Sequence, residues 1–153
     1  MRSTRAAAGS APPRRVVYLT THANAARWFL RGQLAHLAGR GFDPVVIASP
    51  GPDLEVVARR EGVRTIPVEM AREIDPPRDA RALVAVARAL AALRPEIVNA
   101  GTPKAALLGM LAAAALGVPV RVYTMHGLRL ETARGLRRHL LAAAERTTTA
   151  LAH

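Results

Sequence analysis

Short apolar runs alternate along this chain with longer stretches in which apolar residues recur every three or four positions. Short runs of apolar and β-branched residues are typical of buried strands, whereas the longer spacing is typical of helices packed against a sheet. The predicted strands cover residues 16–20, 45–49, 63–68, 97–99 and 118–125. The predicted helices cover residues 25–38, 54–61, 75–93 and 102–116, with one more through Leu141 and Glu145. This alternation predicts an α/β fold with a doubly wound, mostly parallel sheet.

Polar and glycine residues mark the ends of the predicted helices. Asp53 is expected to cap helix 54–61, and Gly62 is expected to end it. Gly32 falls inside helix 25–38, where a glycine costs about 1 kcal/mol relative to alanine. Either close packing against the sheet or backbone approach to a ligand would explain that cost, and packing is the favoured explanation.

The stretch 95–131 predicts a parallel strand–helix–strand unit whose polar residues gather in the loops after the two strands. Parallel strands joined by a right-handed crossover place both loops at the carboxyl edge of the sheet. Open α/β sheets bind their ligands at that edge. We therefore expect the functional site there, built from Asn99, Thr102, Lys104, His126, Arg129 and Glu131.

The helix that starts near Thr102 has the sequence of an anion site. Thr102 is a good N-cap residue, and Pro103 suits the first helical position. Lys104 then places a cation at the positive end of the helix dipole, which is disfavoured by roughly 0.3–1 kcal/mol. An anion bound by Lys104 and the N–H groups of that turn would reverse this cost. The alternative is a lysine that points into water.

His126 follows the predicted strand 118–125 at the ligand edge, with Gly127 beside it. Histidine donates or accepts protons near neutral pH, and a glycine permits close ligand approach. His126 is therefore a candidate catalytic residue, unless it is a structural histidine bonded to the backbone. Arg129 and Glu131 would either orient a phosphate and a hydroxyl or pair with each other.

Arg31 and Gln33 in the first helix, and Arg72 and Glu73 after the third strand, are polar residues near the same edge. Taken singly, each is a solvated surface residue. Together with the loops above, they would ring one cleft. The remaining histidines lack metal-ligand spacing and the chain has no cysteine, so no metal site is expected.

A length of 153 residues suits one domain with a substantial core. The net charge of +11 comes almost wholly from arginine, since Lys104 is the only lysine. Heavy arginine and alanine use can reflect a GC-rich genome, but the charge also suits anionic membranes or phosphorylated ligands. Aromatic residues make up only 3% and the arginines form no single stripe, so a nucleic-acid partner is not expected.

Several common segment types are missing from the chain. Residues 1–15 carry arginines without an apolar core, which predicts a flexible basic tail and not a secretory signal. The longest apolar run, 105–120, falls short of the roughly 20 residues that span a bilayer. No G-x-G-x-x-G follows the first strand and no P-loop motif occurs, which disfavours a dehydrogenase or a P-loop nucleotide binder.

Six segments stand out in order along the chain: YLTT at 18–21, FLRGQL at 29–34, ASPG at 48–51, MAREI at 70–74, NAGTPKA at 99–105 and YTMHGLR at 123–129. This ordered set resembles the amino-terminal domain of bacterial family 4 glycosyltransferases of the GT-B fold. The resemblance extends from about residue 16 to the end. Such enzymes build capsule, exopolysaccharide and lipid-linked glycans of the cell envelope.

The resemblance implies two Rossmann-like domains that face each other across a cleft. The amino-terminal domain binds the acceptor, a glycan or a polyprenyl-diphosphate-linked sugar, and the second domain binds a nucleotide-sugar donor. Transfer retains the anomeric configuration and needs neither a metal nor another cofactor. His126 matches a histidine that lies by the reacting sugar, and Lys104 and Arg129 match positions near phosphate groups.

Two features depart from the family pattern. Residues 99–101 read Asn-Ala-Gly where the family often has His-x-His, so no histidine acts from that loop. We expect no donor-binding domain within these 153 residues, so residues 16–153 are expected to form an acceptor-side domain, part of a truncated or split glycosyltransferase, that is inactive alone. We expect it in the cytoplasm, peripheral at the inner face of the plasma membrane. The alternative is a non-catalytic anion- or partner-binding module that uses the helix start at 102–104.

Overall fold

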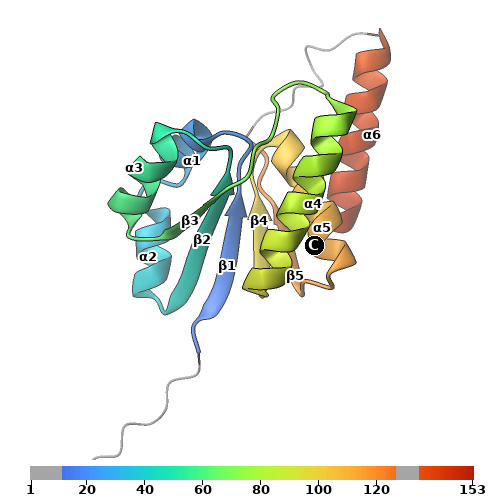
Figure 1. Ribbon diagram of the computed structural model, residues 1–153. Helices are drawn as coiled ribbons and strands as arrows, with labels where there is room; N and C mark the ends of the chain where they lie inside the picture. Colours follow the sequence, from blue (N-terminus) through green and yellow to red (C-terminus); the bar gives the residue numbers. More distant parts are fainter. Residues whose placement is uncertain (1–11, 127–134) are drawn as a thin grey trace, which may run out of the picture.

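A computed structural model describes residues 12–126 and 135–153 as a five-stranded sheet with helices on both faces (Figure 1). The strands are β1 (Arg14–Leu19), β2 (Phe42–Ala48), β3 (Arg64–Pro67), β4 (Ile97–Ala100) and β5 (Val120–Tyr123). The helices are α1 (Ala23–Phe29), α2 (Gln33–Gly39), α3 (Pro52–Glu61), α4 (Pro76–Leu93), α5 (Pro103–Ala115) and α6 (Gly135–Leu151). All strand pairs are parallel in the order β3-β2-β1-β4-β5, which confirms the predicted fold class.

The alternation of side chains along the strands divides the core into two layers. Val17 and Leu19 of β1 pack on one face with residues of α4 and α5. Val16 and Tyr18 pack on the other face with residues of α1, α2 and α3. Successive side chains of a strand point to opposite faces, so a sheet covered on both sides has apolar residues at consecutive positions. Figure 1 shows the two helix layers on either side of the sheet.

The predicted helix 25–38 is instead two short helices, α1 and α2, separated by a turn at Gly32. Gly32 has a φ of +73°, in the left-handed region that favours glycine. A Cβ atom built on Gly32 would meet no heavy atom within 4 Å. The explanation by close packing is therefore wrong, and the glycine is needed for its backbone conformation.

Glu61, at the end of α3, secures this turn from a distance. Its side chain is buried, and its carboxylate accepts hydrogen bonds from the N–H groups of Gly32 at 3.0 Å and Ala35 at 3.2 Å. Arg60 donates a third hydrogen bond at 2.6 Å. Burial alone would raise the pKa of Glu61, but these hydrogen bonds together lower it. A carboxylate thus stabilises the start of α2, in agreement with the sign of the helix dipole.

Two charged residues make contacts other than those expected. Asp53 makes no capping hydrogen bond and instead pairs with Arg27 of α1 at 2.6 Å. Gly62 ends α3 in the left-handed conformation, with a φ of +66°, as predicted. The basic tail predicted over 1–15 is too long, because Arg15 already belongs to β1 and pairs with Asp43 at 2.6 Å.

The last helix is joined to the outer strand β5 by contacts of Arg121. The Arg121 guanidinium donates to the carbonyl oxygen of Leu151 at 2.6 Å, and the Arg121 carbonyl accepts from the N–H of His153 at 2.8 Å. The predicted helix through Leu141 and Glu145 is confirmed as part of α6. Among the described residues, no helix is both long enough and apolar enough to cross a membrane.

Gly32→Ala is expected to lower the free energy of unfolding by about 1–2 kcal/mol, because alanine is strained in the left-handed region. Gly39→Ala is the matched control, since Gly39 lies in α2 without a positive φ and with open space around it. Alanine there should leave stability unchanged or raise it by up to about 1 kcal/mol. Urea denaturation measures both variants, and equal effects would contradict the conformational explanation.

Candidate functional site

The loops after β4 and β5 meet at the carboxyl edge of the sheet, as the sequence predicts. The N–H of Thr124 donates to the carbonyl of Ala100 at 3.0 Å, and the N–H of Gly101 donates to the carbonyl of Leu19 at 3.0 Å. These backbone hydrogen bonds continue the parallel ladder past the ends of the strands. They bring the loops after β1, β4 and β5 into one surface.

His126 lies at this edge, three residues beyond the end of β5, and is exposed. Its imidazole stacks on the ring of Phe29, with the ring centroids 4.1 Å apart and the ring planes inclined by 11°. No described residue hydrogen-bonds to its ring nitrogens, so the described part of the chain gives no support to the alternative of a structural histidine bonded to the backbone. The role of His126 in chemistry stays a prediction, and its nitrogens are free of described partners.

A small cavity of about 90 Å³ lies beside His126, with Tyr18, Asn99 and Thr124 among its lining residues. The Thr124 hydroxyl donates to the side-chain oxygen of Asn99 at 2.8 Å. Burial raises the pKa of Tyr18, and a side-chain hydrogen bond with Asn99 partly offsets that effect. The cavity thus presents hydroxyl and amide groups, which are the groups that bind ligand hydroxyls.

The helix start at Thr102 is capped differently from the prediction. The Thr102 side chain makes no capping hydrogen bond to α5. Its hydroxyl oxygen accepts from the N–H of Thr21 at 2.7 Å and lies 2.8 Å from the Thr21 hydroxyl. The Thr21 hydroxyl in turn accepts from the N–H of Ala105 at 3.3 Å. Thr21 therefore supplies the cap, and an N–H group expected to bind an anion already has a partner.

Lys104 is held by groups of the protein. Its ammonium pairs with Asp79 of α4 at 2.5 Å and also donates to the backbone carbonyl of Glu73. The Lys104 side chain is only 13% exposed, so the alternative of a lysine that points into water is wrong. A role for Lys104 in phosphate binding stays a prediction, weakened because its charge is already neutralised by Asp79.

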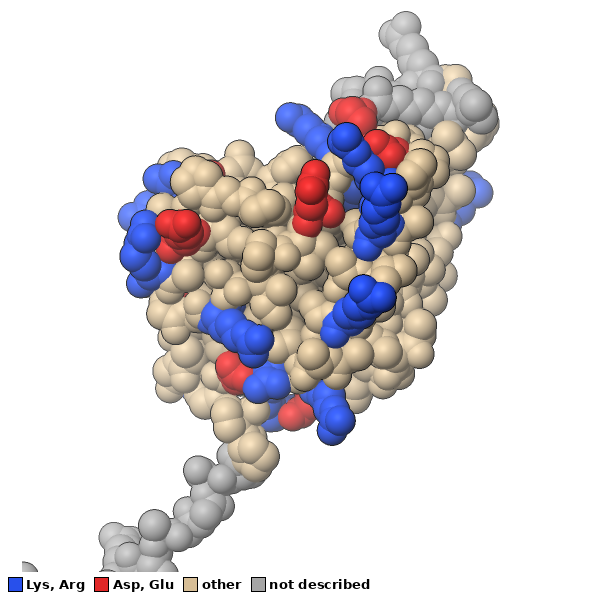
Figure 2. Space-filling view, in the orientation of Figure 1, with Lys and Arg blue, Asp and Glu red and all other residues tan. Residues whose placement is uncertain are grey.

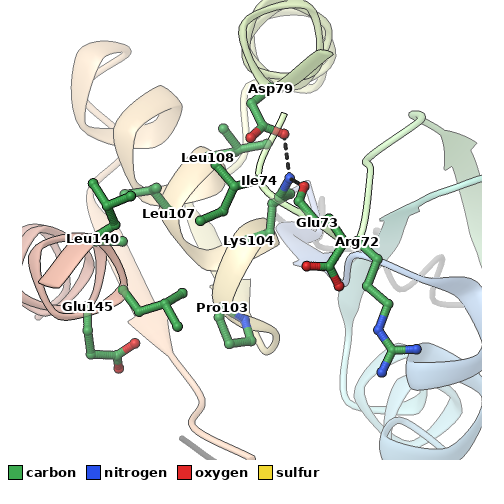
Figure 3. Close-up of a pocket in the computed structure, with 12 residues that line it drawn as sticks. Arg72, Glu73, Ile74, Asp79, Pro103, Lys104, Leu107, Leu108, Leu140 and Glu145 are labelled. Carbon is green, nitrogen blue, oxygen red and sulfur yellow. Dashed lines mark hydrogen bonds and ion pairs between the residues drawn. The ribbon is translucent and has the colours of Figure 1, made fainter. Parts of the chain in front are cut away.

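Arg72, Glu73 and Lys104 all line one cavity of about 270 Å³ between α4, α5 and α6 (Figure 3). Leucine side chains of α5 and α6 form much of its wall. Glu145 lies at the α6 side and interacts with Tyr123, whose pKa is raised first by burial and then by this carboxylate. Arg72 and Glu73 both have interaction partners within the protein.

The predicted residues therefore do not ring a single cleft. Arg72, Glu73 and Lys104 share the larger cavity, whereas His126 lines the smaller one. Arg31 lies exposed in the turn between α1 and α2 and lines neither cavity. Arg129 and Glu131 fall outside the described residues. Among the described residues, no group of three or more histidine, aspartate or glutamate side chains could hold a metal ion.

Three residues of the site were not identified from the sequence. Phe29 falls in the predicted helix 25–38, yet it is 50% exposed and contacts His126. Thr21 carried a signal, because a hydroxyl directly after a buried strand can bond to a neighbouring loop. His22 was assigned no site, but its Nε2 atom is buried without a hydrogen-bond partner among the described residues, and burial and Arg72 lower its pKa.

Lys104→Met is expected to lower the free energy of unfolding by about 1–3 kcal/mol, because it leaves the partly buried Asp79 without its cation. Arg59→Met is the matched control, since Arg59 pairs with Glu55 at 3.6 Å on an exposed helix face. That change should stay within about 0.5 kcal/mol. Urea denaturation measures both variants. Equal losses would contradict the claim that the pair of Lys104 with Asp79 stabilises the fold.

A comparison with protein families identifies a glycosyl transferase 4-like domain over residues 24–153. The chain is also similar to the capsular polysaccharide biosynthesis glycosyltransferase CapM of Staphylococcus aureus. The two are 36% identical over 117 residues, a match that covers 76% of this chain and 30% of CapM. The chain thus spans less than a third of the length of that relative.

Solved structures with the same fold include MurG of Acinetobacter baumannii, with a TM-score of 0.60 and 16% identity over 86% of this chain and 39% of MurG. They also include a UDP-N-acetylglucosamine 2-epimerase of Neisseria meningitidis, with a TM-score of 0.64 and 14% identity over 90% of this chain and 39% of that enzyme. At this identity, the two structures show a shared fold only. The family match and the similarity to CapM go further, and they show that the chain belongs to the glycosyl transferase 4-like domain family.

Proposed function

We propose that the chain is the acceptor-side part of a retaining glycosyltransferase that acts in cell-envelope polysaccharide synthesis. Its acceptor is a glycan or a polyprenyl-diphosphate-linked sugar, and His126 lies beside the reacting sugar. The observation that carries the proposal is the position of His126. It stands exposed at the ligand edge of the sheet, next to a cavity of hydroxyl and amide groups, with no described partner on either ring nitrogen.

The name of the CapM relative supports the choice of substrate, since it describes a glycosyltransferase of capsular polysaccharide biosynthesis. We propose that the donor is a nucleotide-sugar and that a second domain binds it. The chain matches 30% of CapM, which leaves ample length in such a protein for a donor domain. We therefore expect the chain alone to transfer no sugar, and we expect the complete reaction to need neither a metal nor another cofactor.

We further propose that the protein works at the cytoplasmic face of the membrane as a peripheral protein. Its net charge of +11 favours anionic lipids. Figure 2 shows basic side chains along α4 as well as others scattered over the visible face. Arg81 and Arg88 are exposed on α4, with Val84 between them, and neither makes an ion pair with a described residue.

Binding of farnesyl-diphospho-N-acetylglucosamine to the purified chain, followed by isothermal titration calorimetry, tests the acceptor site. His126→Gln should weaken binding about tenfold, the equivalent of one lost hydrogen bond to a charged group. His36→Gln, at an exposed position of α2, is the control and should bind as the wild type does. Full affinity in His126→Gln, with loss only in Lys104→Met, would favour the non-catalytic anion-binding module. Sugar transfer from UDP-N-acetylglucosamine by the chain alone would contradict its expected inactivity.

Cosedimentation with phosphatidylglycerol vesicles tests the membrane contact. The chain should bind at about 0.05 M salt and dissociate at about 0.5 M, because screening shortens the reach of surface charges. The double change Arg81→Gln, Arg88→Gln should weaken binding roughly thirtyfold, at about 1 kcal/mol for each arginine. Arg14→Gln is the control, since Arg14 is already paired with Glu96 at 2.7 Å. Equal binding to phosphatidylcholine vesicles would argue against an electrostatic contact.

A further inference from the structure

We propose that Phe29 is a positioning residue for His126: its ring face sets the plane of the imidazole without a hydrogen bond to either ring nitrogen. The use of the oriented imidazole at an acceptor site rests on the proposed function, whereas the stacking itself does not. The two residues lie nearly a hundred positions apart in the sequence, and their rings lie 4.1 Å apart at an angle of 11°. Near-parallel aromatic rings at this separation make an attractive contact.

The placement of Phe29 shows that it is not an ordinary core residue. It is the last residue of α1 and is 50% exposed, whereas Ala26 and Leu30 of the same turn are buried in the core. A large aromatic side chain left half in water forgoes much of its hydrophobic stabilisation. Its recorded ring contact is with His126, at the ligand edge of the sheet.

Gly101, which follows β4, provides the second wall of the slot that holds the imidazole. A Cβ atom on Gly101 would lie 3.0 Å from Nε2 and 3.2 Å from Cδ2 of His126, closer than most Cβ atoms pack, so the histidine ring would have to shift. The φ of Gly101 is not positive, so the backbone conformation does not require glycine there. The missing side chain makes room for the histidine ring.

The described contacts thus hold His126 by its faces and edge without a hydrogen bond to either nitrogen. When a protein orients a histidine by a hydrogen bond to one ring nitrogen, that nitrogen can no longer donate to or accept from a ligand. A ring fixed by stacking loses neither nitrogen to a hydrogen bond, although Nε2 of His126 lies close to Gly101. The same ring borders the cavity of about 90 Å³ that also contains Asn99 and Tyr18 in its wall. A ligand hydroxyl that enters this cavity would meet an imidazole of fixed orientation.

Nuclear magnetic resonance of the chain with labelled histidines tests the stacking, with His126→Gln identifying the His126 signals. In the wild type, the ring protons of His126 should be shifted upfield by the ring current of Phe29. Phe29→Leu should abolish that shift, and Phe29→Tyr should retain it. Trp28→Leu is the matched control, because Trp28 is the adjacent exposed aromatic residue, 64% exposed, and is not stacked on His126. Unchanged His126 signals in Phe29→Leu would overturn the proposal.

Gly101→Ala tests the slot without altering Phe29. The added methyl group should displace the imidazole and reduce the upfield shift, whereas Gly39→Ala should leave the His126 signals unchanged. These two variants keep the proposal testable if Phe29→Leu fails to fold. A Gly101→Ala chain with wild-type His126 signals would overturn the assignment of the slot.

Calorimetry with farnesyl-diphospho-N-acetylglucosamine connects the stack to ligand binding. Phe29→Leu should weaken binding severalfold at unchanged thermal stability, and Phe29→Tyr should restore it. Wild-type affinity in a folded Phe29→Leu chain would overturn the positioning role. If the wild-type chain binds no probe while the ring-current shifts behave as expected, the acceptor function fails and the stacking of His126 on Phe29 stands.

Discussion

The carboxyl edge of the sheet depends on the hydrogen bonds that gather at Thr21. Its N–H and hydroxyl bond to Thr102, its hydroxyl caps α5 through Ala105, and its carbonyl accepts from Ser49 at 2.6 Å. Ser49 also bonds to the backbone of Met70. One residue thus connects, directly or through Ser49, the loops that follow β1, β2, β3 and β4. Loops joined in this way provide a rigid base for any side chain that faces the ligand edge.

Internal contacts also engage polar groups that the sequence predicts to bind a ligand. The Thr102 hydroxyl is engaged by Thr21, and the Lys104 ammonium is engaged by Asp79. An anion at the start of α5 would have to compete with these internal partners, whereas a ligand at His126 displaces no described hydrogen bond. The groups at the helix start are therefore less available to a ligand than His126 at the end of β5. These contacts favour an acceptor site built around His126 over a simple anion site at α5.

The features predicted correctly from the sequence have local causes. The apolar runs specify the strands, and Gly62 ends α3 because glycine adopts the left-handed conformation of a helix end at little cost. The features that were missed depend on distant partners. Asp53 pairs with Arg27, and Lys104 pairs with Asp79. Phe29 stacks on His126, which follows the outer strand β5. The spacing of residues within one helix or strand cannot predict such contacts. Residue types therefore located the edge of the site, but not which side chains remain available there.

The fold by itself does not determine the chemistry of this chain. MurG and a UDP-N-acetylglucosamine 2-epimerase resemble it about equally, with TM-scores of 0.60 and 0.64. The reaction must therefore be inferred from particular side chains and not from the fold. His126 is distinctive among them because stacking on Phe29 orients it while its nitrogens stay without described partners. An exposed imidazole exchanges hydrogen bonds with water, and not with other protein groups, when a ligand hydroxyl binds, so the exchange leaves no buried protein group unpaired.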